Sequence, residues 1–210
     1  MMVAVLSDEY ERAARWKTTV WDVLDRYGRR ESPHTWEVPA EVALAVLIAA
    51  SDGSRYGKWS YYAVELSIAA HDRKTPAELL AVVASGRPAG LAGLGAGPLV
   101  IISLRHRAVL YVAAVAKICR AYGTRVAGIR GGGAWELPPA LGPAVAALDE
   151  VGSHYHAGRA YREGLRGVVE LARARAPAEE VAVAALRLRE ALLPRYAPRA
   201  LERVLEGVGV

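Results

Sequence analysis

Residues 98–122 read PLVIISLRHRAVLYVAAVAKICRAY, and this stretch decides the fold class. Two short apolar runs within it, Pro98 to Ile102 and Val109 to Val112, have the length and the branched side chains of buried strands. The second run continues through alanine-rich sequence to Lys117, which favours a buried helix. We interpret the whole segment as helical. The chain is therefore expected to be all-α, a helical bundle with an N-terminal helical arm.

Helical patterns continue on both sides of this segment. Ser7 can cap a helix whose apolar stripe reaches Tyr27 and which Gly28 ends. The polar sequence that follows is typical of a linker, so residues 1–30 are expected to form the arm and residues 31–210 the bundle. No repeat of fixed period stands out. Further helices are expected at about residues 39–51, 59–70, from 75 onward, 144–151, 156–175, 178–192 and 198–206, with irregular glycine- and proline-rich segments at 86–98 and 131–143.

The charge of the chain is unevenly distributed. Its 27 basic residues and 22 acidic residues give a net charge of +5. Between Leu79 and Trp135 there is no Asp or Glu, so the seven cations of this window make it strongly positive and leave the remainder slightly negative. A localised cationic surface is the electrostatic pattern of a phosphate-binding face, although a solvated basic face without a partner has the same pattern. Residues expected to contact nucleic acid are Arg55, Tyr56, Lys58, Trp59, Arg87, Arg105, Arg107, Lys117, Arg120, Arg125 and Arg130.

Several classes of protein are disfavoured by composition. A single cysteine, Cys119, excludes an intramolecular disulfide and a cysteine-cluster metal site, and no cofactor is expected. The longest apolar runs are much shorter than the roughly 18 residues of a membrane span, so no transmembrane helix is expected. The N-terminus soon meets Asp8 and Glu9 and lacks the zones of a signal peptide.

Two enzymatic interpretations remain as alternatives. Residues 91–95 read LAGLG and resemble the hairpin of helix-hairpin-helix DNA glycosylases, in which glycines let backbone amides approach a phosphate. Those enzymes need an Asp shortly after the hairpin, and here the next one is Asp149.

A tyrosine recombinase is the second enzymatic alternative. His156 and Arg159 have its H-x-x-R spacing, Arg55 or Arg87 would supply a further arginine, and Tyr196 would attack the phosphate that the arginines hold. Chains rich in Arg and Tyr produce such spacings by chance. We therefore expect a protein that is not an enzyme.

Two segments resemble the coat proteins of rod-shaped and filamentous archaeal viruses. Residues 55–59 read RYGKW and are similar to the Arg-Tyr-x-Lys-Trp segment of that family, which lies on a DNA-contacting helix. Residues 94–98 read LGAGP and, with the later Arg107 and Tyr111, are similar to its Leu-Gly-Gly-Gly-Pro segment with a later Lys and Tyr. Together these matches cover about two dozen residues of the chain.

The resemblance implies a structural virion protein of a virus of hyperthermophiles. It would be a helical bundle that pairs with itself or with a paralogous coat protein and wraps linear double-stranded DNA in A form. Its location would be the helical capsid, the host cytoplasm during assembly, and contact with an envelope where the virion has one. Phosphate neutralisation along a whole genome needs Arg and Lys rather than base readout, which agrees with the charge pattern. A cellular nucleoid protein is a further alternative.

Overall fold

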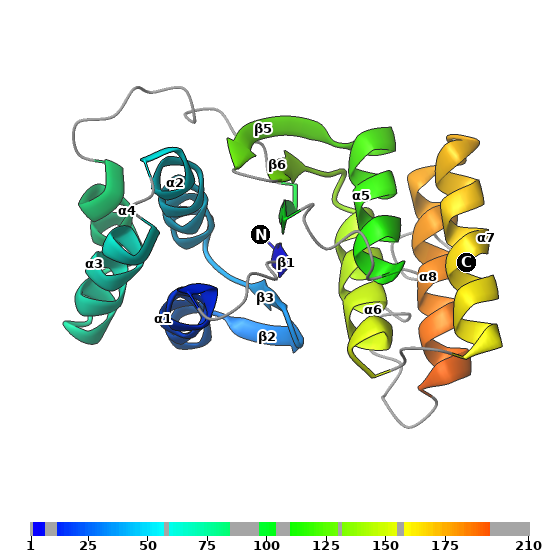
Figure 1. Ribbon diagram of the computed structural model, residues 1–210, viewed down its shortest axis with the longest axis horizontal. Coiled ribbons are helices and arrows are strands. Elements are labelled where there is room, and N and C mark those ends of the chain that lie inside the picture. The colour runs from blue at the N-terminus through cyan, green and yellow to red at the C-terminus, as the bar shows by residue number, and fades with distance from the viewer. Residues whose placement is uncertain are drawn as a thin grey trace.

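A computed structural model describes residues 2–6, 12–56, 59–84, 97–103, 110–129, 132–154 and 158–193. In these ranges the chain forms eight helices and one six-stranded mixed sheet, so the all-α prediction is wrong and the fold is α/β (Figure 1). The first half contains β1 (Met2–Leu6), α1 (Arg12–Tyr27), β2 (Arg29–Ser32), β3 (Thr35–Glu37), α2 (Ala40–Tyr56), α3 (Trp59–His71) and α4 (Pro76–Ala84). The second half contains β4 (Leu99–Ser103), α5 (Leu110–Tyr122), β5 (Thr124–Ile129), β6 (Gly132–Glu136), α6 (Leu141–His154), α7 (Arg159–Arg173) and α8 (Ala178–Leu192).

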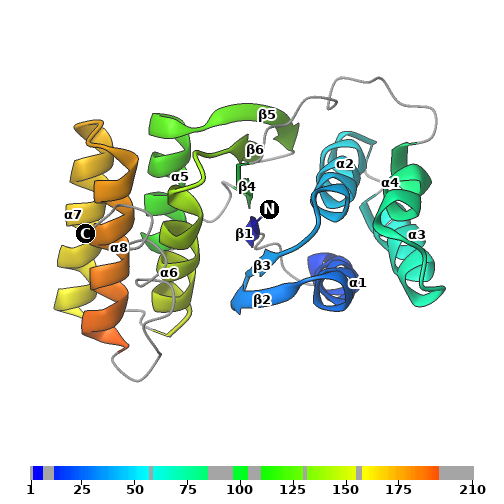
Figure 2. The same ribbon diagram turned by 180° about the vertical axis from the view of Figure 1, so that it is seen from behind.

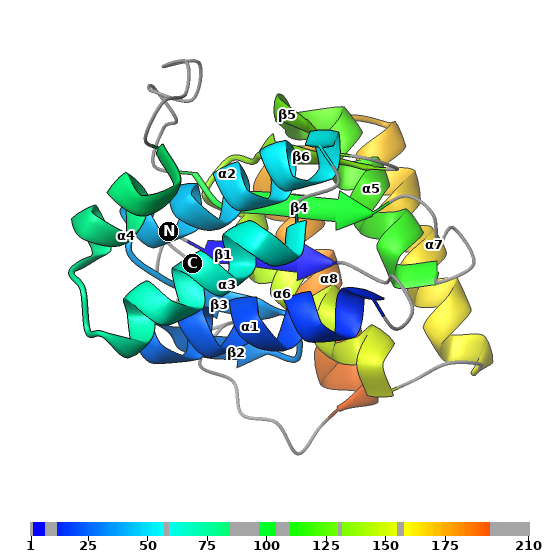
Figure 3. The same ribbon diagram turned by 60° about the vertical axis from the view of Figure 1, so that its left-hand side comes forward.

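The sheet has the strand order β2-β3-β1-β4-β6-β5. Its central pair, β1 and β4, is parallel, with Val3 opposite Leu99, and every other pair is antiparallel. Figure 3 shows the arrows of β1 and β4 pointing the same way. The two ends of the sheet are therefore formed by β2 and β5.

The segment that decided the sequence interpretation divides into a strand and a helix. Leu99 and Ile101 face one side of the sheet and Val100 and Ile102 the other, and all four are buried. A strand that is covered by helices on both faces has a continuous apolar sequence, which resembles that of a buried helix. The helical interpretation of residues 98–102 is therefore wrong, whereas a helix through Lys117 is confirmed by α5.

Helices cover both faces of the sheet. The helices α1–α4 lie on one face and α5–α8 on the other (Figures 1 and 2). Each layer has its own apolar core, one built around Trp36 and Leu47 and the other around Ile118 and Leu148. None of the helices in the described ranges has the length and apolar sequence needed to span a membrane.

The N-terminal arm expected in the fold class is also wrong. Strand β1 lies in the middle of the sheet, and α1 contributes the buried Val20, Val23 and Leu24 to the first core. The expected division between residues 30 and 31 falls inside β2. Because β1 pairs with β4, the first residues of the chain belong to the centre of the fold.

Other sequence-based expectations had mixed outcomes. The helices expected at 39–51, up to residue 70, from 75, at 144–151, 156–175 and 178–192 are confirmed in type by α2, α3, α4, α6, α7 and α8. The segment 131–143, expected to be irregular, contains β6 and the start of α6. The helix expected at 198–206 lies outside the described residues.

The two halves of the chain repeat one order of elements. Each half is β-α-β-β-α-α-α, and we call β1 through α4 the first unit and β4 through α8 the second unit. Short sequence matches occur at equivalent places. Tyr27 and Gly28 end the first helix as Tyr122 and Gly123 do, and the sequence WEVP at 36–39 corresponds to WELP at 135–138.

Hydrogen bonds repeat between the units as well. The hydroxyl of Tyr27 donates to the carbonyl of Lys74 at 2.5 Å, and that of Tyr122 donates to the carbonyl of Ala176 at 2.6 Å. Both acceptors lie in the turn between the last two helices of their unit. The residues before them, Arg73 and Arg175, adopt a positive φ of 55° and 54°. Contacts of the same kind at matching positions allow the units to be aligned residue by residue.

A half-turn about an axis parallel to the strands relates the two units. The equivalent strands β1 and β4 lie side by side and parallel, while the helices of the two units lie on opposite faces. The equivalent Trp36 and Trp135 accordingly belong to different cores. Each unit can therefore be compared with the other. Where equivalent positions carry different residues, the shared fold does not require either residue.

Candidate nucleic-acid interface

The structure describes part of the expected nucleic-acid surface. Lys117 and Arg120 are exposed on α5, and Arg125 is exposed on the edge strand β5. The backbone of Arg55 and Tyr56 belongs to α2 and that of Trp59 begins α3, but their side chains lie outside the description. Lys58, Arg87, Arg105, Arg107 and Arg130 lie outside the described residues altogether.

The helix α5 places its two cations on one exposed side. Its opposite side is buried through Tyr111, Val115 and Ile118, as expected for an amphipathic helix that packs on a sheet. Lys117 and Arg120 are three residues apart, so their side chains lie about one turn apart on the same side. Both cations are in the second half of the helix, where the helix dipole favours positive charge.

The first unit has carboxylates where the second has these cations. Counting back from the equivalent Tyr27 and Tyr122 pairs Asp22 with Lys117 and Asp25 with Arg120. All four side chains are exposed. Because the same helix in the same fold tolerates either sign of charge, packing does not require Lys117 and Arg120. Their positive charge is therefore a property of the exposed surface and not a requirement of packing.

A third charge difference lies beside the first two. In the first unit, Asp22, Asp25 and His71 line one cleft of about 430 Å³ between α1 and α3, together with Arg26. The turns at Arg73 and Arg175 align His71 with Arg173. The second unit therefore has a further cation, Arg173, at the position of His71, on the helix α7 that packs against α5.

Arg125 and Arg30 occupy equivalent positions on the two edge strands. Each guanidinium lies over the tryptophan of the neighbouring strand, 4.7 Å from the Trp36 ring centre for Arg30 and 5.9 Å from the Trp135 ring centre for Arg125. Arg30 is also held by two hydrogen bonds to Asp25, at 3.1 and 2.9 Å. No carboxylate among the described residues holds Arg125, because Arg120 stands at the position of Asp25.

The turn between α7 and α8 completes this surface. Arg175 donates from Nη1 to the carbonyl of Ala121 at 3.1 Å and so holds the turn against the end of α5. Burial raises the pKa of the adjacent Tyr122, which Arg175 partly offsets and Glu180 increases. We define the basic face as Lys117, Arg120, Arg125, Arg173 and Arg175.

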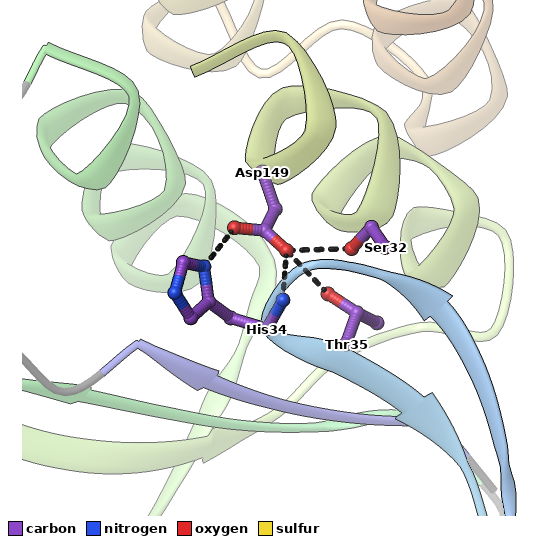
Figure 4. A network of polar contacts seen from close by, with 4 residues as sticks. All are labelled: Ser32, His34, Thr35 and Asp149. Atoms are coloured by element: carbon purple, nitrogen blue, oxygen red, sulfur yellow. Dashed lines mark hydrogen bonds and ion pairs between the residues drawn. The ribbon is translucent and has the colours of Figure 1, made fainter. Parts of the chain in front are cut away.

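A buried acid that sequence analysis missed connects the two units (Figure 4). The carboxylate of Asp149 on α6 accepts hydrogen bonds from the Ser32 hydroxyl at 2.5 Å, the His34 amide at 2.7 Å and the Thr35 hydroxyl at 3.3 Å. Its second oxygen lies 2.7 Å from Nδ1 of His34. Asp149 is completely buried, and its equivalent in the first unit is Ala50. The contact fixes the turn between β2 and β3 against α6.

The neighbouring Glu150 forms a second buried contact, an ion pair with Arg189 of α8. Its equivalent in the first unit is Ser51. Two adjacent carboxylates in the otherwise apolar sequence of α6 are the signal that could have revealed this site. Both carboxylates have partners within the protein, which is typical of structural connections.

The residues of the enzymatic alternatives are only partly described. Arg159 is an exposed residue at the start of α7 and pairs with Glu163 at 2.7 Å. His156, Tyr196 and the glycine-rich segment 91–95 lie outside the described residues. Among described residues, no three His, Cys, Asp or Glu side chains gather as metal ligands. Comparison of the chain with protein-family models, with curated proteins and with solved structures gave no match.

Proposed function

We propose that this protein binds double-stranded DNA through the phosphate backbone, without reading base sequence, and that it has a structural role in DNA packaging. The observation that carries the proposal is the reversal of charge between the two units at Asp22 and Lys117 and at Asp25 and Arg120. The two units share one fold but carry opposite charges at these exposed positions, so the second unit presents cations that packing does not require. The five cations of the basic face come from α5, β5, the last residue of α7 and the turn between α7 and α8.

Phosphate contacts of this kind have a simple chemistry. Arg offers a planar fork of donors to phosphate oxygens, and four of the five cations are Arg. Contacts to phosphate position a protein on a duplex but carry no sequence information. Binding to DNAs of unrelated sequence should therefore be equally tight.

The proposal rests on the basic face more than on the resemblance to coat proteins. That resemblance implies a helical bundle, and the six-stranded sheet is a different architecture. The role of a virion coat subunit that assembles on DNA in the host cytoplasm is the narrower form of the proposal. It requires regular filaments in addition to binding.

The test is a salt titration of binding to two duplexes of unrelated sequence, measured by fluorescence anisotropy. Five neutralised phosphates give a slope of log K against log salt of about −4.5. The double variant Lys117→Glu/Arg120→Glu should bind weakly, with a slope nearer about −2.7. Arg187→Glu, a charge reversal at an exposed position of α8, is the matched control and should bind like the wild type.

The opposite results would remove the proposal. Binding that depends on sequence, or that survives in the double variant, would show that the basic face does not hold the DNA. Tighter binding to an RNA duplex than to a DNA duplex would show that RNA is the preferred partner. Electron microscopy of the protein with linear DNA separates packaging, which gives regular filaments on intact DNA, from an enzymatic role, which gives cut DNA.

A further inference from the structure

The charge reversal also makes the two units complementary to each other. Asp22 and Asp25 are three residues apart on α1, and Lys117 and Arg120 have the same spacing at the same place on α5. Two helices that approach in antiparallel fashion would set Asp22 against Arg120 and Asp25 against Lys117. Equal spacing and opposite sign allow both ion pairs to form at once.

The surroundings of the two acids form a receiving surface. The cleft beside them, about 430 Å³, is also lined by Ser67 and His71 of α3 and by Arg26 of α1. Arg26 donates from Nη1 to the Ala70 carbonyl at 3.1 Å, so part of its hydrogen-bonding capacity is used within the protein. Asp22 has no hydrogen-bond or ion-pair partner among the described residues, whereas Asp25 already accepts from Arg30 and from Nε1 of Trp36. The carboxylate of Asp22 is therefore the freer of the two. We define the acidic face as Asp22, Asp25, Ser67 and His71.

An exposed apolar pair adjoins the acidic face on α3. Val64 is 49% exposed and Ile68 58% exposed, one turn apart. Their equivalents in the second unit are Arg166 and Glu170, which form a surface ion pair at 3.8 Å. The fold therefore accepts polar residues at these positions. The pair adds apolar surface beside the acidic face, which a bound partner would cover.

We propose that the acidic face of one copy of this chain binds the basic face of a second copy, and that this contact competes with DNA. The competition, but not the contact, rests on the proposed function, because both partners would use Lys117 and Arg120. A second copy is favoured as the occupant because it carries the matching pair of cations at the matching spacing. The contact is heterologous, so an added copy leaves one acidic and one basic face for the next copy, and the association gives either a closed ring or an open-ended chain.

The test is sedimentation velocity of the full-length chain without nucleic acid. The wild-type protein should sediment as species larger than the monomer at about 0.01 M salt and as a monomer at about 1 M salt, since screening shortens the reach of exposed charges from about 30 Å to about 3 Å. The single variants Asp22→Lys and Lys117→Glu should each be monomeric at low salt. Circular dichroism would verify that both variants are folded.

A mixture of the two variants provides the decisive measurement. Asp22→Lys keeps an intact basic face and Lys117→Glu keeps an intact acidic face. An equimolar mixture should therefore form a one-to-one dimer that grows no further. The matched controls Arg187→Glu and Glu190→Lys, both on α8, should associate like the wild type.

Three results would overturn the inference. They are a wild-type protein that stays monomeric at low salt, a mixture that stays monomeric, and single variants that associate as before. The proposed function fails separately, because it predicts that Lys117→Glu weakens DNA binding and that Asp22→Lys does not. Added duplex DNA should dissociate the wild-type oligomers in proportion to the DNA bound. Oligomers that persist with saturating DNA would exclude competition between DNA and a second copy for the basic face.

Discussion

The substitution Asp149→Ala should strongly destabilise the fold. It removes the acceptor of three hydrogen bonds and of the His34 ring contact, and it does so at a completely buried position. The Ser32 and Thr35 hydroxyls would then be buried without this acceptor. Each stranded donor costs about 1–3 kcal/mol, and removing one partner of a buried charged network typically costs about 3–5 kcal/mol in total.

We therefore expect the free energy of unfolding to fall by about 3–5 kcal/mol, or the melting temperature to fall by about 6–20 °C for a chain of this length. Guanidinium denaturation followed by circular dichroism measures the first quantity and calorimetry the second. The matched control is Ser32→Ala, which leaves the carboxylate its other donors and should cost about 1 kcal/mol. A loss below 1 kcal/mol for Asp149→Ala would refute the assignment of this acid as the connection between α6 and the β2–β3 turn.

Four further outcomes are expected. Tyr27→Phe and Tyr122→Phe should each lower the free energy of unfolding by about 1 kcal/mol, because both hydroxyls donate to equivalent turn carbonyls, and clearly unequal losses in denaturation experiments would contradict their equivalence. Gly28→Ala should destabilise far more than Gly158→Ala in the same assay, because a Cβ at Gly28 would lie 2.2 Å from Cγ1 of Val38 whereas Gly158 has open space. Burial raises the pKa of Cys119 to about 12, so a thiol reagent at pH 8 should label it only as the protein unfolds, and rapid labelling of the native protein would show that it is accessible. The amide and hydroxyl of Thr75 donate to the Glu78 carboxylate and lower its pKa below the ordinary 4.5. The cap of α4 should therefore contribute stability above pH 4.5 and lose it as the pH falls through the pKa that Glu78 has in the folded protein. An NMR titration of Glu78 in the wild type and in Thr75→Ala would measure this shift.

The helices were predictable because their patterns are long. Residues 178–192 were expected as a helix and form α8 with those bounds, and the capping box of Thr75 and Glu78 begins α4 as expected. The strands were missed for physical reasons. Strand β4 is apolar on both faces, β3 has only three residues, and β6 begins with two glycines that favour an irregular interpretation.

The internal repeat escaped sequence analysis because few residues need to be identical to preserve it. Only the Tyr-Gly pairs at 27 and 122 and the Trp-Glu-x-Pro segments at 36 and 135 match clearly, and the helices between them differ in length. The exposed cations, in contrast to the repeat, left a signal in the sequence. A window without carboxylates predicted a positive surface, and Lys117, Arg120 and Arg125 are all exposed. Their contrast with Asp22 and Asp25 became visible only when the structure aligned the two units.

The parallel pairing of β1 with β4 has a consequence for synthesis of the chain. Residues 2–6 leave the ribosome well before their partner strand at residues 99–103, which follows almost 100 residues later. Pairing between such distant segments slows folding, because a long loop must close before any contact compensates for it. Until β4 has been synthesised, the edge of β1 that pairs with it stays unpaired, and unpaired strand edges are prone to aggregation. Rapid early packing of α1 and α2 against β1 and β3 would shorten that exposure. The exposed edge of β1 is covered once β4 has been synthesised and has paired with it.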